Sequence, residues 1–195
     1  MHDGRRTGKW ILHVKGFMKL LFCDNSLKQL INFRGEVIRH FLAKGCEVVL
    51  VAPGSEIEIP FTGRIRHYAP ELKRSGMNPM KDFSYFRFLS RIYKEESPDL
   101  VFHYTIKPNI YGSLAARLNS IKSISVITGL GYAFYHSDLR SIIARTLYRF
   151  AMRFPCRILV LNDENRRIVI ERHIADPDRL ILLNGGEGID IQYFK

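Results

Sequence analysis

The segment HYTIKPNIYG holds two side chains, His103 and Lys107, that could bind a phosphate or a sugar hydroxyl. An imidazole can donate or accept a proton near neutral pH, and a lysine ammonium neutralises a phosphate. The segment follows an apolar run at residues 100–102, and a helix pattern begins just after it, so free backbone N–H groups are expected beside the lysine. An ordinary histidine at the end of a strand and a solvated lysine fit the same pattern about equally well.

Two glycine-containing segments also follow predicted strands. The first, TGLGYAF, contains Thr128, Gly129, Gly131 and Tyr132, and the second, NGGEGID, contains Asn184, Gly186 and Glu187. Glycine lets the backbone approach a ligand closely or adopt a positive φ angle. We therefore count these residues as candidates for ligand binding. A plain turn explains the first segment nearly as well, and a hinge or a disordered tail explains the second.

A stripe of arginines, Arg145, Arg149 and Arg153, recurs at a spacing of four residues beside the apolar Ile142 and Phe150. This pattern predicts an amphipathic helix with a basic side. One interpretation is a membrane-contact surface that rests on anionic lipid. The other is an ordinary helix with its apolar side in the core and its arginines in water.

The hydrophobic period alternates between 2 and 3.6 along the chain, which predicts strands and helices in turn. Strands are expected at residues 19–23, 47–52, 65–69, 100–104, 123–128, 157–161 and 179–183. Helices are expected at residues 33–44, 83–96, 110–119, 139–154 and 164–173. This order predicts a single doubly wound, Rossmann-like α/β domain with a mainly parallel sheet of about seven strands. Ligands are then expected at the carboxyl ends of the strands.

Composition and charge restrict the function further. The 195 residues are 46% hydrophobic and 25% charged, which is ordinary for a globular domain. The net charge of +11 predicts an anionic partner: a nucleic acid, an anionic membrane or a phosphorylated small molecule. No nucleic-acid-binding motif accompanies the charge, so nucleic acid is the poorest fit. The widely spaced Cys23, Cys46 and Cys156 indicate a reduced, intracellular protein whose thiols pack in the core.

The motifs that the sequence lacks exclude several enzyme classes. It contains neither the GxxxxGK[ST] of P-loop nucleotide hydrolases nor the GxSxG of α/β-hydrolases. The first strand leads into Asp24, Asn25 and Ser26, and not into the GxGxxG of a nicotinamide site. No histidines pair at i,i+4, so no metal is expected. Residues 1–17 lack a signal-peptide core, and we interpret them as an N-terminal extension, non-native or disordered, before a domain at 18–195.

An ordered series of segments resembles a known family. The segments are NFRG at 32–35, VVLVAP at 48–53, HYTIKPNIYG, ITGLGYAF, LNDEN and NGGEGIDIQYF. The series resembles the N-terminal domain of bacterial family 4 glycosyltransferases of the two-lobed GT-B fold, most closely those of capsular and surface polysaccharide synthesis. This resemblance implies the acceptor-binding lobe of an enzyme that moves a sugar from a nucleotide-sugar donor to a lipid-linked or nascent polysaccharide acceptor.

The resemblance also implies the roles of individual residues. It places His103 near the transferred sugar as a catalytic residue, and it places Lys107 and Asn109 near the acceptor or the diphosphate. The segment from Thr128 to Gly131 would lie beneath the acceptor. Asn25 stands in the first loop, where many relatives carry a glycine pair against the donor diphosphate, so this loop departs from the family's pattern for donor contact.

The expected partners follow from the same resemblance. The nucleotide sugar would bind a C-terminal donor lobe that this chain lacks, so the chain alone is expected to be inactive. No cofactor or metal is expected, and the protein would be cytoplasmic and peripherally associated with the inner membrane. Two alternatives remain open: a lobe of a nucleotide-sugar epimerase with the GT-B fold, and a basic nucleic-acid-binding module.

Overall fold

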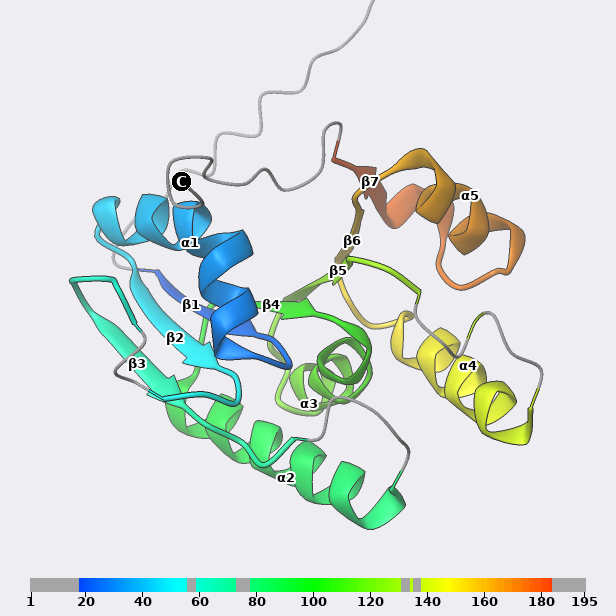
Figure 1. Cartoon of the computed structure of the whole chain (residues 1–195), viewed down its shortest axis with the longest axis horizontal. Coiled ribbons are helices and arrows are strands. Elements are labelled where there is room, and N and C mark those ends of the chain that lie inside the picture. The colour runs from blue at the N-terminus through cyan, green and yellow to red at the C-terminus, as the bar shows by residue number, and fades with distance from the viewer. Residues whose placement is uncertain (1–17, 56–58, 73–77, 131–133, 135–137, 184–195) are drawn as a thin grey trace, which may run out of the picture.

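The computed structural model describes residues 18–55, 59–72, 78–130, 134 and 138–183, which form a seven-stranded sheet (Figure 1). The strands are β1 (Lys19–Cys23), β2 (Glu47–Val51), β3 (Ile65–Tyr68), β4 (Leu100–Tyr104), β5 (Ser123–Ile127), β6 (Arg157–Val160) and β7 (Leu180–Leu182). Their order across the sheet is β3-β2-β1-β4-β5-β6-β7, and every neighbouring pair is parallel. The predicted doubly wound α/β domain is confirmed.

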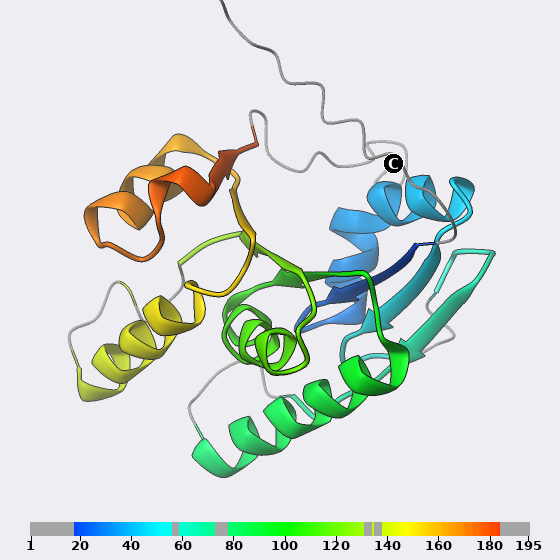
Figure 2. The ribbon, with the colours of Figure 1, turned by 180° about the vertical axis from the view of Figure 1, so that it is seen from behind.

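Helices cover both faces of this sheet. Helix α1 (Leu27–Ala43) lies on one face. The opposite face carries α2 (Pro79–Glu96), α3 (Ser113–Leu118) and α4 (Leu139–Ala151), as the reverse view shows (Figure 2), and also α5 (Asp163–Glu171), whose Val169 packs in one cluster with α4 and with Ile158 and Val160 of β6. A π-helical turn, η2 (Pro108–Gly112), leads into α3, and a 3-10 turn, η4 (Pro177–Arg179), precedes β7. Because both faces are covered, Leu20, Leu21 and Phe22 of β1 are all buried, and the strand reads as a continuous apolar run.

Two helices begin earlier than predicted, and capping side chains fix their first turns. Helix α1 begins at Leu27 and not near residue 33, since the Ser26 side chain accepts a hydrogen bond from the N–H of Gln29. Helix α2 begins at Pro79 and not near residue 83, since Asn78 Oδ1 accepts from the N–H of Lys81 at 3.1 Å. The polar first turn of α2 carries little apolar periodicity, which explains its late predicted start. In α1 the apolar spacing is present from the first turn, with Leu27, Leu30 and Ile31 all buried, so the predicted start near residue 33 is wrong.

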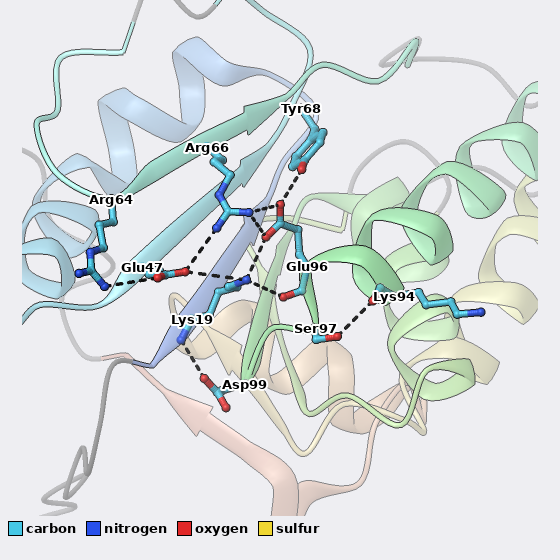
Figure 3. A network of polar contacts seen from close by, with 9 residues as sticks. All are labelled: Lys19, Glu47, Arg64, Arg66, Tyr68, Lys94, Glu96, Ser97 and Asp99. Carbon is cyan, nitrogen blue, oxygen red and sulfur yellow. Dashed lines mark hydrogen bonds and ion pairs between the residues drawn. The ribbon is translucent and has the colours of Figure 1, made fainter.

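A network of charged groups attaches the end of α2 to the first three strands (Figure 3). The buried carboxylate of Glu96 accepts hydrogen bonds from Lys19 Nζ at 3.1 Å, from Arg66 Nη1 at 2.9 Å and from the Tyr68 hydroxyl. Burial alone would raise the pKa of Glu96, but the bonds from Tyr68 and Lys19 and the charge of Arg66 outweigh it and lower the pKa. Lys19 is the first residue of β1, and it also pairs with Glu47, the first residue of β2. The network therefore lies at the amino-terminal ends of these strands, opposite the carboxyl ends where the ligand is expected.

The cysteines follow the prediction only in part. Cys23 and Cys46 are buried, and burial raises the pKa of the Cys23 thiol to about 12. Cys156 is exposed, so its predicted packing role in the core is wrong.

Among the helices within the described residues, none is both long and apolar enough to cross a membrane. The predicted extension at 1–17 lies outside the described residues.

Candidate functional site

The sheet has a topological switch point between β1 and β4. From β1 the chain order runs outward to β2 and β3 on one side, and from β4 it runs to β5, β6 and β7 on the other. Connections leave such a point in opposite directions, so a crevice forms at the carboxyl ends of the two strands. Cys23 of β1 pairs with His103 of β4 at the end of this ladder. Asn25 and Thr105, each two residues farther on, therefore flank the switch point.

Thr105 has a strained backbone at this point, with φ at +65°. A β-branched residue seldom adopts this left-handed conformation, because its Cβ crowds the following carbonyl oxygen. Strain of this kind concentrates at functional sites. The side-chain oxygens Thr105 Oγ1 and Asn25 Oδ1 are both shielded from solvent, and neither has a hydrogen-bond partner within the described part of the chain. Buried oxygens without a partner are uncommon, so their occurrence at a switch point makes Asn25 and Thr105 candidate site residues.

Lys107 lies just beyond Thr105 and is held in an ion pair. Its Nζ donates to Asp82 Oδ1 at 2.8 Å, and the two side chains are only 15% and 7% exposed. Asp82 lies in the first turn of α2, so the pair links the segment after β4 to that helix. The alternative interpretation of Lys107 as a solvated lysine is wrong. Contact of Lys107 with a phosphate stays a prediction.

His103 lies inside the core and not at the surface of the crevice. Its side chain is fully buried, with Nε2 at 2.8 Å from the Tyr93 hydroxyl and Nδ1 at 3.4 Å from Ser113 Oγ. Burial lowers the pKa of His103 to about 3, so the imidazole is neutral at physiological pH. The expectation of an exposed imidazole with a near-neutral pKa is wrong. The catalytic assignment itself stays a prediction, and the burial supports a positioning role in its place.

Asn109 is also internal, at 1% exposure. Its Nδ2 donates to the carbonyl oxygen of Val126 at 3.0 Å and to the Tyr148 hydroxyl at 3.2 Å. It therefore joins η2 to β5 and to α4. Asn109 is therefore close to the loop that follows β4, and its contacts hold that loop against the protein core.

The glycine segments are described only in part. Thr128 and Gly129 are partly exposed just after β5, and a β-carbon built on Gly129 would meet no atom within 4 Å. The backbone there is open to a ligand. The remaining glycine-segment candidates lie outside the described residues: Gly131, Tyr132, Asn184, Gly186 and Glu187.

The arginine stripe follows the prediction at two of its three positions. Arg149 of α4 and Arg153 just beyond it are exposed, whereas Arg145 is half-buried and has an interaction partner. Contact of the stripe with lipid stays a prediction.

Across the residues that the structure describes, no group of three or more His, Cys, Asp or Glu side chains is arranged to hold a metal ion.

Thr105 is the site residue that sequence reasoning missed. The segment HYTIKPNIYG includes it, but threonine favours extended backbone, and nothing in the residue type signals a positive φ. Asp24 is a second such residue, because the sequence singles it out only as a departure from the GxGxxG motif. It is fully buried at the end of β1, and its Oδ1 accepts a hydrogen bond from the N–H of Asn25 at 2.6 Å.

The sequence profile of the family described as Glycosyl transferase 4-like matches residues 20–162, from β1 through β6. The chain belongs to the glycosyl transferase 4-like family. The resemblance seen in the sequence segments is therefore confirmed. The matched region includes the switch point, so Asn25, Thr105 and Lys107 all lie within the glycosyl transferase 4-like domain.

Two curated relatives are bacterial glycosyltransferases. One is the N,N'-diacetylbacillosaminyl-diphospho-undecaprenol alpha-1,3-N-acetylgalactosaminyltransferase of Campylobacter jejuni, 21% identical over 91% of this chain and 48% of the relative. The other is the UDP-Gal:alpha-D-GlcNAc-diphosphoundecaprenol alpha-1,3-galactosyltransferase of Escherichia coli, 28% identical over 65% of this chain and 32% of the relative. The chain thus spans about half or less of the length of the curated relatives it matches.

Solved structures share the fold of this glycosyl transferase 4-like chain. The UDP-N-acetylglucosamine 2-epimerase of Rickettsia bellii superposes with a TM-score of 0.63 at 15% identity, over 88% of this chain and 46% of that chain. At this identity the likeness shows the fold alone. The fold is therefore shared with a sugar epimerase, as expected of the GT-B architecture.

Proposed function

We propose that this chain is the acceptor-binding lobe of a glycosyltransferase that moves a sugar from a nucleotide-sugar donor to a lipid-linked or nascent polysaccharide acceptor. The observation that carries the proposal is the family match over residues 20–162. Two relatives whose names specify undecaprenol-linked acceptors support it. The nucleotide-sugar donor would bind a second lobe, because in the two-lobed GT-B fold the acceptor and the donor occupy different lobes.

The switch point suggests how this lobe would contribute to transfer. Transfer requires that the acceptor hydroxyl be oriented toward the donor sugar and that the charge of the leaving diphosphate be stabilised. Asn25 Oδ1 can accept a hydrogen bond from an acceptor hydroxyl, and Thr105 Oγ1 can donate or accept one. Lys107 brings a cation to the same edge of the sheet, held by Asp82.

His103 would act in this proposal as a positioning residue. It is neutral and enclosed, and its bonds to Tyr93 and Ser113 connect α2 and α3 beneath the loop that carries Thr105. A rigid support of this kind fixes the geometry of the groups above it. No cofactor or resident metal is part of the proposal.

The cellular setting belongs to the same proposal. An enzyme acting on a lipid-linked acceptor works at a membrane surface, and a net charge of +11 favours an anionic one. We propose that the protein lies on the cytoplasmic side of the inner membrane and serves capsular or surface polysaccharide synthesis. Exposed Arg149 and Arg153 would then face lipid phosphates.

Transfer by the full-length protein tests the proposal directly. The protein is incubated with a radiolabelled UDP-sugar and undecaprenyl-diphosphate-linked N-acetylglucosamine, and the organic phase is counted. We expect the label to enter the lipid-linked product. Conversion of UDP-N-acetylglucosamine to its 2-epimer, with no label in the lipid fraction for any donor, would contradict the proposal and favour the epimerase alternative.

A further inference from the structure

The segment 105–112, which follows β4 and includes η2, adopts an unfavourable conformation. Thr105 has φ at +65°, and Pro108–Gly112 form a π-helical turn in place of an α-helical one. The side-chain oxygens Thr105 Oγ1 and Asn109 Oδ1 are shielded from solvent, and neither has a hydrogen-bond partner within the described part of the chain. A positive φ at a β-branched residue and an unpaired buried oxygen each cost free energy, and π-helical turns are rare. Such a conformation persists only where surrounding groups hold it.

Neighbouring elements hold segment 105–112 on its core side. Asn109 Nδ2 donates to the carbonyl oxygen of Val126 in β5 and to the Tyr148 hydroxyl of α4. The N–H of Asn109 donates to the carbonyl oxygen of Thr105 at 3.0 Å, which closes the first turn after β4. These bonds fix η2 against the core, but none of them joins the stretch from Thr105 to Lys107 to another element.

Asp82 of α2 holds that stretch from outside the segment. Its Oδ1 accepts a hydrogen bond from Lys107 Nζ at 2.8 Å, and among the ion pairs within the described residues this is the one that reaches segment 105–112. Burial and the Asp82 carboxylate together raise the pKa of Tyr111 in η2, so the same carboxylate also lies close to the turn itself. One acidic side chain thus meets the segment at two places.

Asp82 is itself firmly placed. It lies in the first turn of α2, where its N–H donates to the carbonyl oxygen of Asn78 at 2.8 Å. Tyr85 and Leu89 bury one side of this helix in the core, and Glu96 attaches its last turn to the strands through the ion network. The carboxylate that meets segment 105–112 therefore projects from a helix that is anchored at both ends.

The burial of the Lys107–Asp82 pair makes it strong enough to hold the segment. The two side chains are 15% and 7% exposed, whereas those of the surface pair Arg91–Glu95 are 64% and 54% exposed. Water screens a surface pair, but removal of one partner from a buried pair leaves an uncompensated charge. Without Asp82, the Lys107 ammonium would move toward water and carry the segment with it.

We infer that Asp82 is a positioning residue of the proposed transfer reaction, because it holds segment 105–112 in this conformation through Lys107 and thereby fixes Thr105 at the switch point. Asp82 acts through the segment, and contact with a substrate is not part of the inference. The role in transfer rests on the proposed function, but the restraint on the segment requires neither donor nor acceptor.

Hydrogen exchange on residues 1–195 tests the restraint. The reporter is the peptide that contains the Asn109 N–H, whose bond to Thr105 closes the segment. We expect exchange about tenfold faster in Asp82→Asn, because the segment then opens locally. Lys107→Gln breaks the same pair from the other side and should have the same effect, so the test stands even where one variant does not fold.

Glu96→Gln is the matched control for the exchange experiment. It breaks a buried pair with Lys19 at the opposite end of the same helix, so exchange of the reporter peptide should stay as in the wild type. Unchanged exchange in Asp82→Asn and Lys107→Gln would overturn the inference. An equal acceleration in Glu96→Gln would overturn it too, since the effect would then follow from lost stability alone.

Kinetics of the full-length protein test the role in transfer. Asp82→Asn should lower kcat about tenfold through loss of alignment, and it should not raise KM for the lipid-linked acceptor, because Lys107 keeps its charge. Asp82→Glu retains the carboxylate and should recover most of kcat, and Glu96→Gln should keep kcat. A raised KM with unchanged kcat in Asp82→Asn would contradict a positioning role. Absence of sugar transfer by the wild type, with the exchange result intact, would contradict only the proposed function.

Discussion

Gly112 and His103 are packed so closely that a side chain at position 112 would force one of them to shift. A β-carbon built on Gly112 would lie 2.4 Å from Cδ2 and 2.5 Å from Nε2 of His103. The π-helical turn η2 therefore closes directly over the imidazole. This contact, together with the bonds to Tyr93 and Ser113, explains why the histidine at the end of β4 is internal. His103 thus supports the η2 turn, which continues the loop that carries Thr105 and Lys107.

We expect the Gly112→Ala and His103→Ala variants to be destabilised and coupled. Overpacking at Gly112 should lower the free energy of unfolding by about 1–3 kcal/mol. Loss of the buried imidazole should lower it by about 2–4 kcal/mol. The double variant should lose less than the sum, because the new methyl group then occupies vacated space. Urea unfolding measures all three, and strictly additive losses would show that the two residues do not share this contact.

His103 should also make stability depend on pH. Its pKa is lowered from 6.5 to about 3 by burial, so the folded state excludes a proton that the unfolded chain binds. The stability that the neutral His103 gives to the folded state is complete above pH 6.5. As the pH falls toward 3, the free energy of unfolding decreases by up to about 1.4 kcal/mol per pH unit. His103→Gln should remove this slope, while His40→Gln, on exposed α1 surface, should keep it. An NMR titration that protonates His103 near neutral pH in the folded protein would refute the explanation.

Thr105→Gly should separate stability from activity. Glycine relieves the strain at φ +65°, which offsets its backbone entropy, so the free energy of unfolding should be unchanged or rise by up to about 1 kcal/mol. Loss of the hydroxyl should lower kcat/KM of the full-length enzyme at least tenfold. Ser120→Gly is the matched control, because Ser120 has φ +57° beyond the end of α3 and should keep full activity. Full activity of Thr105→Gly would remove Thr105 from the site.

Glu96 should be the most sensitive residue of the ion network. Its carboxylate is 3% exposed and bonded to Lys19, Arg66 and Tyr68, so Glu96→Gln should cost about 2 kcal/mol. Because its pKa is lowered, its contribution is present above pH 4.5 and is lost as the pH falls through the folded value. Glu95→Gln breaks only an exposed pair with Arg91 and should cost no more than about 0.5 kcal/mol. Equal losses in thermal unfolding would contradict this role for Glu96.

The sequence predicts the sheet well because each strand of a covered parallel sheet is a local apolar run. Leu20 to Cys23 and Val48 to Val51 can be recognised without knowledge of their neighbours. Strand order is not local, yet the alternation of strands and helices leaves few topologies for a parallel sheet. The switch point and its expected ligand side follow from that topology.

The state of individual side chains at the site could not be predicted in the same way. The burial of His103 depends on Tyr93, Ser113 and Gly112, which reach it only through tertiary packing. The ion pair of Lys107 depends on Asp82, which lies 25 residues away in sequence. The strain at Thr105 is a property of its backbone and not of its residue type.

Calorimetry on residues 1–195 tests the central claim, that this lobe binds the acceptor. The chain is titrated with a short-chain polyprenyl-diphosphate-linked N-acetylglucosamine and, separately, with UDP-N-acetylglucosamine, with Asn25→Ala and Ser120→Gly as test and control variants. We predict that the lipid-linked sugar binds at least tenfold more tightly than the nucleotide sugar, and that Asn25→Ala alone weakens it. Tight binding of UDP-N-acetylglucosamine with no binding of the lipid-linked sugar would contradict the account.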